Sequence, residues 1–253
     1  MDSVNVARGL PTPTSGSPAL GDSALQSQTL ESVASAVRYH DWLTSLALPH
    51  LGAHPLELGS GLGDYAQRWL DRGVPHVTVT EVDPSRLGYL RQRFADEDRV
   101  NVRVLDVHHV DPADHSAFAM FNVLEHIPDD VGALRAAHSL VPPGGKVIVL
   151  VPAFEFAMSR FDRAVGHVRR YTRGSLEKAL VEAGLTVCDV HYVNMPGLFA
   201  WVLGMRLLRM TPGEGRLLTL WDTWVVPVAR RLEELRRPPF GQSVFAVAQV
   251  PAR

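Results

Sequence analysis

The sequence is poor in cysteine, has no long uncharged apolar run and has no excess of charge of either sign. Cys188 is the single cysteine among 253 residues, which excludes an intrachain disulfide and a metal site built from cysteines. We therefore expect a protein of the reducing cytoplasm, and we expect Cys188, in the run LTVCDV, to pack in the core. A formal net charge of −2 argues against a nucleic-acid partner.

No window of the sequence approaches the roughly 18 uncharged apolar residues of a membrane-spanning helix, so we expect no membrane span. The first residues lack a basic region followed by an apolar stretch, so we expect no secretory signal. Residues 1–28 are rich in Ser, Pro, Gly and Thr, which predicts a disordered N-terminal arm. The length of 253 residues and a hydrophobic content of 46% over the whole chain predict one large domain, 29–253.

From residue 54 onward, short apolar segments alternate with polar segments of helical length. This alternation predicts crossover units and a parallel sheet. Before it, residues 29–52 have near-helical apolar spacing that ends at Pro49 and Gly52, and after it a long apolar insertion, 194–242, precedes the last strand. The expected strands are 55–59, 76–83, 100–106, 117–127, 146–152, 185–193 and 243–250.

Three alternating glycines follow the first expected strand, in ELGSGLG. Gly59, Gly61 and Gly63 stand where an open parallel sheet binds its ligand, and glycine there permits positive φ and lets a ligand touch the backbone. A dinucleotide fingerprint would place a third glycine where Asp64 stands, which argues against a pyrophosphate ligand. Glu57, two residues before the first glycine, indicates a ligand with a cationic group.

Further carboxylates end the next two strands. Glu81 is placed to accept hydrogen bonds from both hydroxyls of a ribose, and Asp106 is placed to bind an exocyclic amine of a nucleobase. Asp83 is the competing candidate for the ribose, but its position before Pro84 is typical of a residue that begins a helix. Taken together, the acids predict a cationic nucleoside as ligand.

The segments ELGSGLG, TEVDPS, VLD, FNVLEHIPDD and SLVPPGGKVIVLVP, in this order and spacing, resemble the motifs of class I S-adenosylmethionine-dependent methyltransferases over about residues 30–250. The segments YHDW, PAFEFAMSRFDRAVGHVRRYT and PPFGQS are similar to those of a bacterial small-molecule group within that superfamily, of type 11/12. The resemblance implies an α/β fold with a Rossmann-like, doubly wound, seven-stranded mixed sheet of order 3-2-1-4-5-7-6, an N-terminal helical lid and an insertion before the last strand. It implies S-adenosylmethionine as cofactor and S-adenosylhomocysteine as product. The cofactor contacts it implies or favours are Tyr39, Glu57, Gly59, Gly61, Gly63, Glu81, Val82, Asp106, Val107, Asn122 and Leu124.

His126 follows the fourth strand, and in this family its loop would face the methyl group. Its imidazole could accept a proton as the acceptor attacks; the alternative is a structural histidine. Tyr39 and His167 are further catalytic candidates, and no metal site is expected. The expected substrate-binding residues are His40, Asp162, Arg170 and Tyr171; alternatively, Asp162 and Arg170 only pair with each other and stabilise their loop.

We expect an acceptor cap built from residues 29–52 and 194–242. The predicted acceptor is a small molecule, a specialised metabolite of aromatic, indole or peptide-derived type, methylated on O, N or a nucleophilic C. The apolar residues of the insertion could instead form a homodimer interface or touch a membrane surface. Two alternative functions remain open: an NAD(P)-dependent oxidoreductase, and a non-catalytic protein that binds the S-adenosyl ligand.

Overall fold

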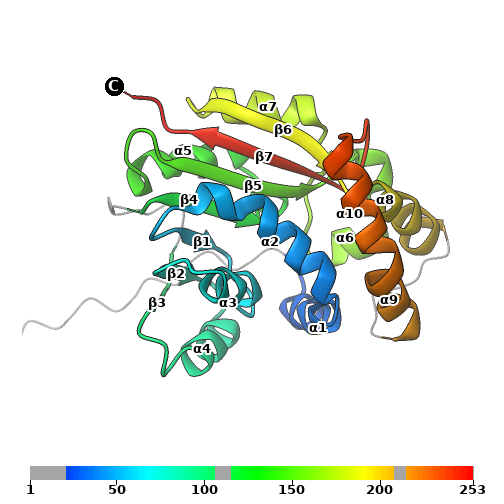
Figure 1. The fold of residues 1–253 in the computed structure, drawn as a ribbon, viewed down its shortest axis with the longest axis horizontal. Helices are drawn as coiled ribbons and strands as arrows, with labels where there is room; N and C mark the ends of the chain where they lie inside the picture. The colour runs from blue at the N-terminus through cyan, green and yellow to red at the C-terminus, as the bar shows by residue number, and fades with distance from the viewer. Residues whose placement is uncertain (1–20, 106–114, 208–214, 253) are drawn as a thin grey trace, which may run out of the picture.

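The computed structural model, which describes residues 21–105, 115–207 and 215–252, has one seven-stranded sheet with helices on both faces (Figure 1). The strand order is β3-β2-β1-β4-β5-β7-β6, which confirms the predicted topology. The strands are β1 (Leu56–Leu58), β2 (Val77–Thr80), β3 (Val100–Arg103), β4 (Ala117–Phe121), β5 (Lys146–Pro152), β6 (Thr186–Val193) and β7 (Ser243–Gln249).

Strands β1 to β5 run parallel, and β7 enters between β5 and β6 in the antiparallel direction. Parallel strands end at one edge of a sheet, so the loops after β1, β2, β4 and β5 gather there. In Figure 1 the arrow of β5 points toward this edge, on the side of α6, α8 and α10. The same edge receives the start of β7, because Ser243 pairs with Pro152.

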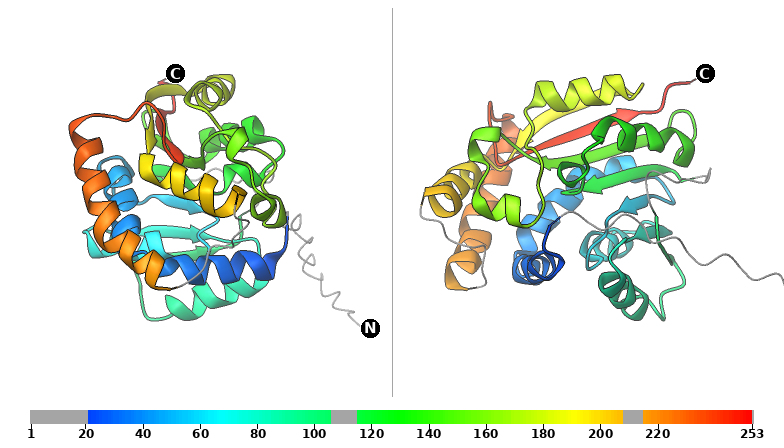
Figure 2. Two further views of the ribbon diagram at one scale, coloured as in Figure 1. Left: turned by 90° about the vertical axis from the view of Figure 1, so that its right-hand side faces the viewer. Right: turned by 180° about the vertical axis from the view of Figure 1, so that it is seen from behind.

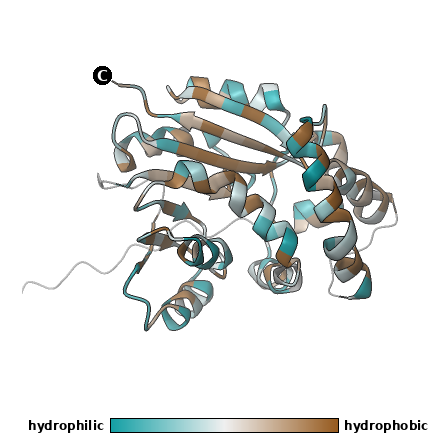
Figure 3. Cartoon of the chain, viewed as in Figure 1, coloured by the Kyte–Doolittle hydropathy of each residue, from teal (hydrophilic) through white to brown (hydrophobic). Residues whose placement is uncertain are grey.

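The central strands are buried on both faces, as the uninterrupted apolar run of β5 predicts. Alternate residues of β5 serve different cores: Val147 and Val149 contact the layer of α5 and α7, whereas Ile148 and Leu150 contact the layer of α2 and α3. Figure 3 shows these strands in the colours of apolar residues and the helices with mixed faces. The helices of the two layers are α2 (Val37–Leu51), α3 (Asp64–Asp71), α4 (Pro84–Arg93), α5 (Asp130–Leu140) and α7 (Arg173–Glu182).

The N-terminal segment forms two helices, α1 (Ser23–Ala34) and α2, where the sequence predicted one helix or a pair. Residues 23–28 were predicted to belong to the disordered arm, and this part of the prediction is wrong. The helix begins there because the Asp22 carboxylate accepts the amide of Leu25, which caps the first turn. The rest of the predicted arm, residues 1–20, lies outside the described residues.

The insertion between β6 and β7 is helical and lies at the carboxyl edge of the sheet (Figure 2). Its elements are α8 (Met195–Trp201), η3 (Val202–Leu207), α9 (Arg216–Leu220), η4 (Trp221–Val225) and α10 (Val226–Leu235). Within the described ranges, none of the helices has both the length and the apolarity that crossing a membrane requires. Cys188 was predicted to pack in the core but is exposed, because β6 is the edge strand and turns that part of its length to solvent.

Candidate active site

The glycine loop connects β1 to α3 in a conformation that side chains would oppose. Gly59, Gly61 and Gly63 all have positive φ, at 63°, 57° and 82°. A Cβ atom on Gly59 would lie 2.8 Å from a methyl of Val123, and one on Gly61 would lie 3.0 Å from a methyl of Leu30. The loop therefore leaves bare backbone beside the first turn of α3, where main-chain amides are available to a ligand.

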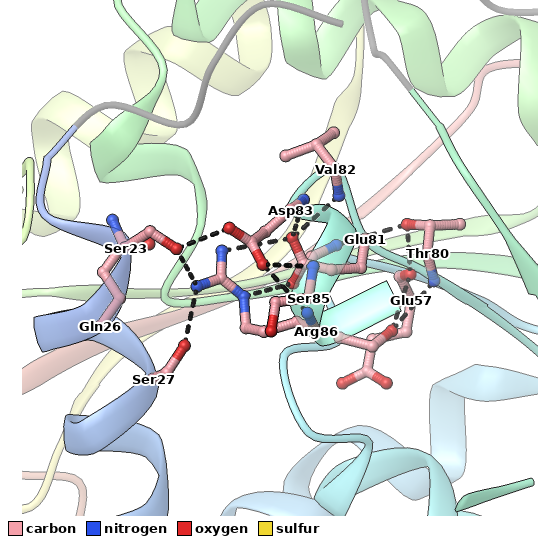
Figure 4. Close-up of polar contacts among 12 residues, drawn as sticks. Ser23, Gln26, Ser27, Glu57, Thr80, Glu81, Val82, Asp83, Ser85 and Arg86 are labelled. Atoms are coloured by element: carbon pink, nitrogen blue, oxygen red, sulfur yellow. Dashed lines mark hydrogen bonds and ion pairs between the residues drawn. The ribbon is translucent and has the colours of Figure 1, made fainter. Parts of the chain in front are cut away.

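Glu57 lies beneath this loop with its carboxylate buried. The residue is 2% exposed, and its Oε2 has no hydrogen-bond partner within the described part of the chain. Figure 4 shows the carboxylate free of dashed contacts, while its main-chain oxygen accepts the hydroxyl of Thr80 at 2.8 Å. Burial raises the pKa of Glu57 to about 8. A buried acid with an unpartnered oxygen fits a cationic ligand group, which would restore its ionised form.

Glu81, the predicted ribose ligand, is buried in a network at the end of β2 (Figure 4). Its Oε1 accepts the amides of Val82 and Asp83 at 2.8 and 3.0 Å, and its Oε2 lies 3.2 Å from Nε of Arg86. Asp83 caps α4 by accepting the amides of Ser85 and Arg86, which confirms its predicted helix-starting role. Glu81 thus keeps a defined orientation before any ligand arrives.

Helix α1 crosses the carboxyl edge above the glycine loop. At one end the Ser23 hydroxyl donates to Asp83 at 2.5 Å, and Arg86 donates to the hydroxyls of Ser23 and Ser27 at 3.4 Å. From the same first turns, but toward another part of the protein, the Gln26 amide donates to the main-chain oxygen of Val165 at 2.7 Å. Helix α1 thus joins the start of α4 to the segment after β5. The predicted lid was the helix of Tyr39, His40 and Trp42, which is α2, and a lid role for either helix stays a prediction.

The loop after β4 contains Asn122, Leu124 and the short turn η1 (Leu124–His126). Asn122 is exposed at a positive φ of 54°, a conformation that asparagine tolerates better than most residues. The Leu124 side chain is fully buried in the core, which leaves only its backbone for the predicted ligand contact. Val82 is 38% exposed at the neighbouring strand end. Asp106 and Val107, the predicted adenine contacts, lie outside the described residues.

Three titratable residues, Glu125, His126 and His167, lie close together beside the loop after β4. Glu125 is fully buried, and neither carboxylate oxygen has a hydrogen-bond partner within the described ranges; burial raises its pKa to about 7 against the opposing charge of His167. The rings of His126 and His167 meet edge to face with centroids 4.6 Å apart. Burial, followed by the neighbouring His167, lowers the pKa of His126 to about 3. A base with so low a pKa is weak near neutrality.

His167 is oriented from behind by Asp162. Its Nδ1 lies 2.9 Å from Asp162 Oδ1, and its Nε2 lies 3.7 Å from Glu125. Although burial opposes the effect, the hydrogen bond from His167 and the charge of Arg170 lower the pKa of Asp162. An ionised aspartate behind one ring nitrogen fixes the tautomer and leaves the other nitrogen as a proton acceptor. One ligand atom each from Glu125, His126 and His167 lies within 4.8 Å of the others, so these side chains could also hold a metal ion.

The predicted substrate-binding residues of this loop are bonded inside the protein. Arg170 donates to Asp162 at 2.7 Å and to the main-chain oxygen of Ala153, and its guanidinium lies 4.9 Å from the ring centroid of Trp201. Tyr171 is 2% exposed, and its hydroxyl donates to Asp130 at 2.9 Å. Asp162 and Arg170 therefore pair with each other, which was the alternative reading of the sequence.

Tyr39 and His40 lie on α2. His40 is buried, with Nδ1 3.1 Å from the main-chain oxygen of Ala36 and its ring against that of Tyr65, and burial lowers its pKa. This environment argues against the predicted substrate contact. Burial also raises the pKa of Tyr39, whose hydroxyl bonds to side chains that begin β7 and the insertion. A bond from Tyr39 to the carboxylate of a ligand stays a prediction.

Sequence reasoning missed two parts of the site, Arg86 and Glu125. Arg86 lies one turn into α4, a position where arginine is ordinary, and nothing in the sequence points it back toward Glu81. Glu125 directly precedes His126 in the motif FNVLEHIPDD, so the sequence does show a carboxylate next to the candidate base. Its significance depends on complete burial, which the sequence does not display.

Comparisons with known proteins match residues 34–190 to the family described as a methyltransferase domain. The chain is 27% identical over 180 residues to the ubiquinone biosynthesis O-methyltransferase of Aeromonas salmonicida, covering 63% of this chain and 75% of that protein. It is 28% identical over 109 residues to the protein of the same name from Xylella fastidiosa, covering 42% and 44%.

Solved structures share the fold at low sequence identity. Geranyl diphosphate C-methyltransferase from Streptomyces coelicolor A3(2) has a TM-score of 0.58 and 12% identity, covering 82% of this chain and 77% of that one. The [4+2]-cyclase SpnF has a TM-score of 0.58 and 17% identity, covering 94% and 100%. The same architecture therefore carries more than one reaction, and the fold alone does not select among them.

Proposed function

The chain belongs to the class I S-adenosylmethionine-dependent methyltransferases, and we propose that it methylates an oxygen, nitrogen or nucleophilic carbon of a small molecule. The small molecule would bind between the loops after β4 and β5 and the helical insertion. The observation that carries the proposal is the buried carboxylate of Glu57, whose unpartnered oxygen lies beneath a glycine loop of bare backbone. Such a site fits a ligand that is a cation and a nucleoside at once.

When bound, S-adenosylmethionine supplies an electrophilic methyl group on a sulfonium that leaves as S-adenosylhomocysteine. Glu57 would face the cationic part of this cofactor, and the backbone of Gly59 and Gly61 would border it. Glu81 would accept the ribose hydroxyls, with Arg86 moving aside or sharing the carboxylate. Asp106 and Val107 remain our candidates for the adenine, and Asn122 for the methionine half. Much of the rate of such a transfer can come from holding the two reactants aligned and close, with effective molarities on the order of 10⁵ M or more.

An acceptor that must lose a proton needs a base, and we assign this role to His167 in preference to His126. Support comes from the 2.9 Å approach of His167 Nδ1 to the Asp162 carboxylate and from the low pKa of His126. In this assignment Asp162 is a positioning residue, and Nε2 of His167 accepts the proton as the methyl group transfers. The fully buried Glu125 lies 3.7 Å from this Nε2 and would compensate the charge that His167 gains.

The names of the curated relatives favour oxygen as the methylated atom, and we propose as acceptor a phenolic hydroxyl of a specialised metabolite, methylated by a cytoplasmic enzyme. A phenol gives up its proton near pH 10, so a base beside it raises the reactive fraction at neutral pH. The aromatic side chains of α8 would accept its ring; Trp201 already stacks on Arg170 at the rim of this loop.

Incubation with S-adenosylmethionine carrying a deuterated methyl group, and a panel of phenols, indoles and amines, tests the proposal. We expect S-adenosylhomocysteine and a labelled product to form together, with phenols preferred. Cofactor binding without transfer to any acceptor would favour the non-catalytic alternative. Quenching of NADH fluorescence at micromolar protein would favour the oxidoreductase; the carboxylate of Asp64, engaged by Arg93 at 2.8 Å, argues against it.

A further inference from the structure

The insertion carries an apolar stripe on the outer face of one continuous helical segment, α9-η4-α10. Its members recur every three or four residues, so they line one side of the helix. Trp224 is 70% exposed and Leu235 is 85% exposed, so both apolar side chains lie largely in solvent. The stripe consists of Leu217, Leu220, Trp224, Val228, Leu232 and Leu235.

The inner face of the same helix is held by polar contacts. The Asp222 carboxylate accepts the backbone amides of Arg38 and Tyr39 at 3.0 and 2.9 Å, and the Glu233 carboxylate accepts those of Asn194 and Met195 at 2.9 and 2.8 Å. Val226 and Ala229 of this face are also buried in the core. The segment therefore has an ordinary apolar face on the core and, in addition, a second apolar row turned to solvent, which a soluble helix normally lacks.

Positive charge borders the stripe. Arg216, Arg231 and Arg236 have no carboxylate partner within the described residues, whereas Arg230 and Arg237 are paired, with Glu234 and Asp189. The acids of the inner face, Asp222 and Glu233, are already engaged by backbone amides. An exposed apolar helix face flanked by uncompensated arginines matches a surface with an apolar interior and anionic head groups.

The stripe also lies beside the site. Both views of Figure 2 show α9 and α10 on the side of the molecule toward which the parallel strands run, next to α8. On α8 and η3, Phe199, Leu203 and Leu207 repeat the spacing and are likewise exposed, at 62%, 57% and 64%. Both described helical segments of the insertion therefore expose apolar side chains, at the edge of the sheet where the ligand loops gather.

We propose that the insertion docks the enzyme on an anionic phospholipid surface through this stripe. Docking would place the apolar side chains at the boundary of the acyl chains and the arginines among the head groups. An acceptor dissolved in the membrane could then reach the carboxyl edge of the sheet without crossing water; this last step rests on the proposed function, whereas docking itself does not.

Co-sedimentation of the full chain with sucrose-loaded vesicles tests docking, using phosphatidylglycerol mixed with phosphatidylcholine against phosphatidylcholine alone. We expect binding to the anionic vesicles and a blue shift of tryptophan emission from Trp224. The double variant Leu220→Ser/Trp224→Ser should lower the partition coefficient about ten-fold or more. Replacing Arg231 and Arg236 with glutamine should lower it about five-fold for each arginine and reduce its dependence on salt.

The matched control is Val181→Ser on α7, a side chain that is equally exposed at 59% but lies outside the insertion. It should bind vesicles as the parent chain does, and all variants should keep the parent's circular dichroism and cofactor affinity. The proposal is overturned if the parent chain stays in the supernatant, or if the stripe variant binds as tightly as the control. A dimer in sedimentation velocity that the stripe variant abolishes, with no vesicle binding, would assign the stripe to a second copy instead.

Discussion

Binding of S-adenosylmethionine near neutral pH should release a proton from Glu57. In the free protein the carboxyl is buried and its pKa is about 8, so at pH 7 it is mostly protonated. A cationic group at the unpartnered oxygen favours the ionised form, so the proton leaves as the ligand binds. We expect close to one proton released per bound cofactor at pH 7, and release that fades above pH 8.

The same shift sets the sign and size of a stability effect. The folded pKa lies above the ordinary value of 4.5, so the unfolded chain carries the charge more readily than the folded one, and Glu57 destabilises the free protein progressively as pH rises from 4.5 to 8. Because pH 7 lies about 2.5 units above the unfolded pKa and still below the folded one, the loss of stability at pH 7 is about 3 kcal/mol. Replacing Glu57 with glutamine should therefore raise the melting temperature at pH 7 to 8 and leave it unchanged near pH 4.

Isothermal titration calorimetry in buffers of different ionisation enthalpy measures the proton release. The parent chain should show an observed enthalpy that depends on the buffer, and Glu57→Gln should show weaker binding with no such dependence. Glu177→Gln, at an exposed position of α7, is the control and should match the parent. An observed enthalpy independent of buffer in the parent chain, or a glutamine variant that binds the cofactor as tightly, would refute the role given to Glu57.

Three further predictions concern the residues around the ligand. Glu81→Ala should weaken cofactor binding by about 1 to 3 kcal/mol through lost charged hydrogen bonds, and calorimetry at wild-type affinity would defeat the ribose assignment. His167→Ala should lower kcat by about 10²-fold or more at unchanged cofactor affinity. Asp162→Asn should also lower kcat, because it disturbs the tautomer of His167, and should shift the pH-rate profile. If His126→Ala alone reduces turnover, the base is His126. Ser23→Ala removes the hydroxyl that joins α1 to α4, so it should speed cofactor dissociation in stopped-flow measurements, and an unchanged rate would separate α1 from ligand exit.

The fold could be predicted because each strand has a recognisable apolar pattern in its own stretch of sequence. The run KVIVLVP is apolar at every position, as a central strand between two helical layers requires, and the order of the remaining strands followed from the resemblance. The two errors arise where tertiary position overrides composition. Residues 23–28 are polar enough to read as disordered, yet Asp22 caps them into a helix that packs on the glycine loop. Cys188 lies in an apolar run, but its strand is the last in the sheet.

For the site, the sequence indicates which residues stand at strand ends but not which partners they meet. Glu57 and Glu81 were both predicted ligands, and they differ greatly in the structure: one oxygen of Glu57 is unpartnered, whereas Arg86 and two amides hold Glu81. The dyad of Asp162 and His167 joins residues five apart across a loop whose course no periodicity describes. Only the folded chain brings the two side chains together.

The insertion leaves the sheet and returns to it at one point. Asn194 and Gln242, which bound it, are 48 residues apart in sequence, yet their side chains bond at 2.6 Å and the amide of Gln242 donates to the main-chain oxygen of Asn194 at 3.0 Å. Because loop-closure entropy grows only slowly with length, the pairing of Asn194 with Gln242 tolerates great variation in the length of the segment between them. The catalytic sheet can accordingly keep its geometry while the enclosed helices are exchanged, shortened or rebuilt, so that new acceptors or new surfaces are reached by altering one removable module.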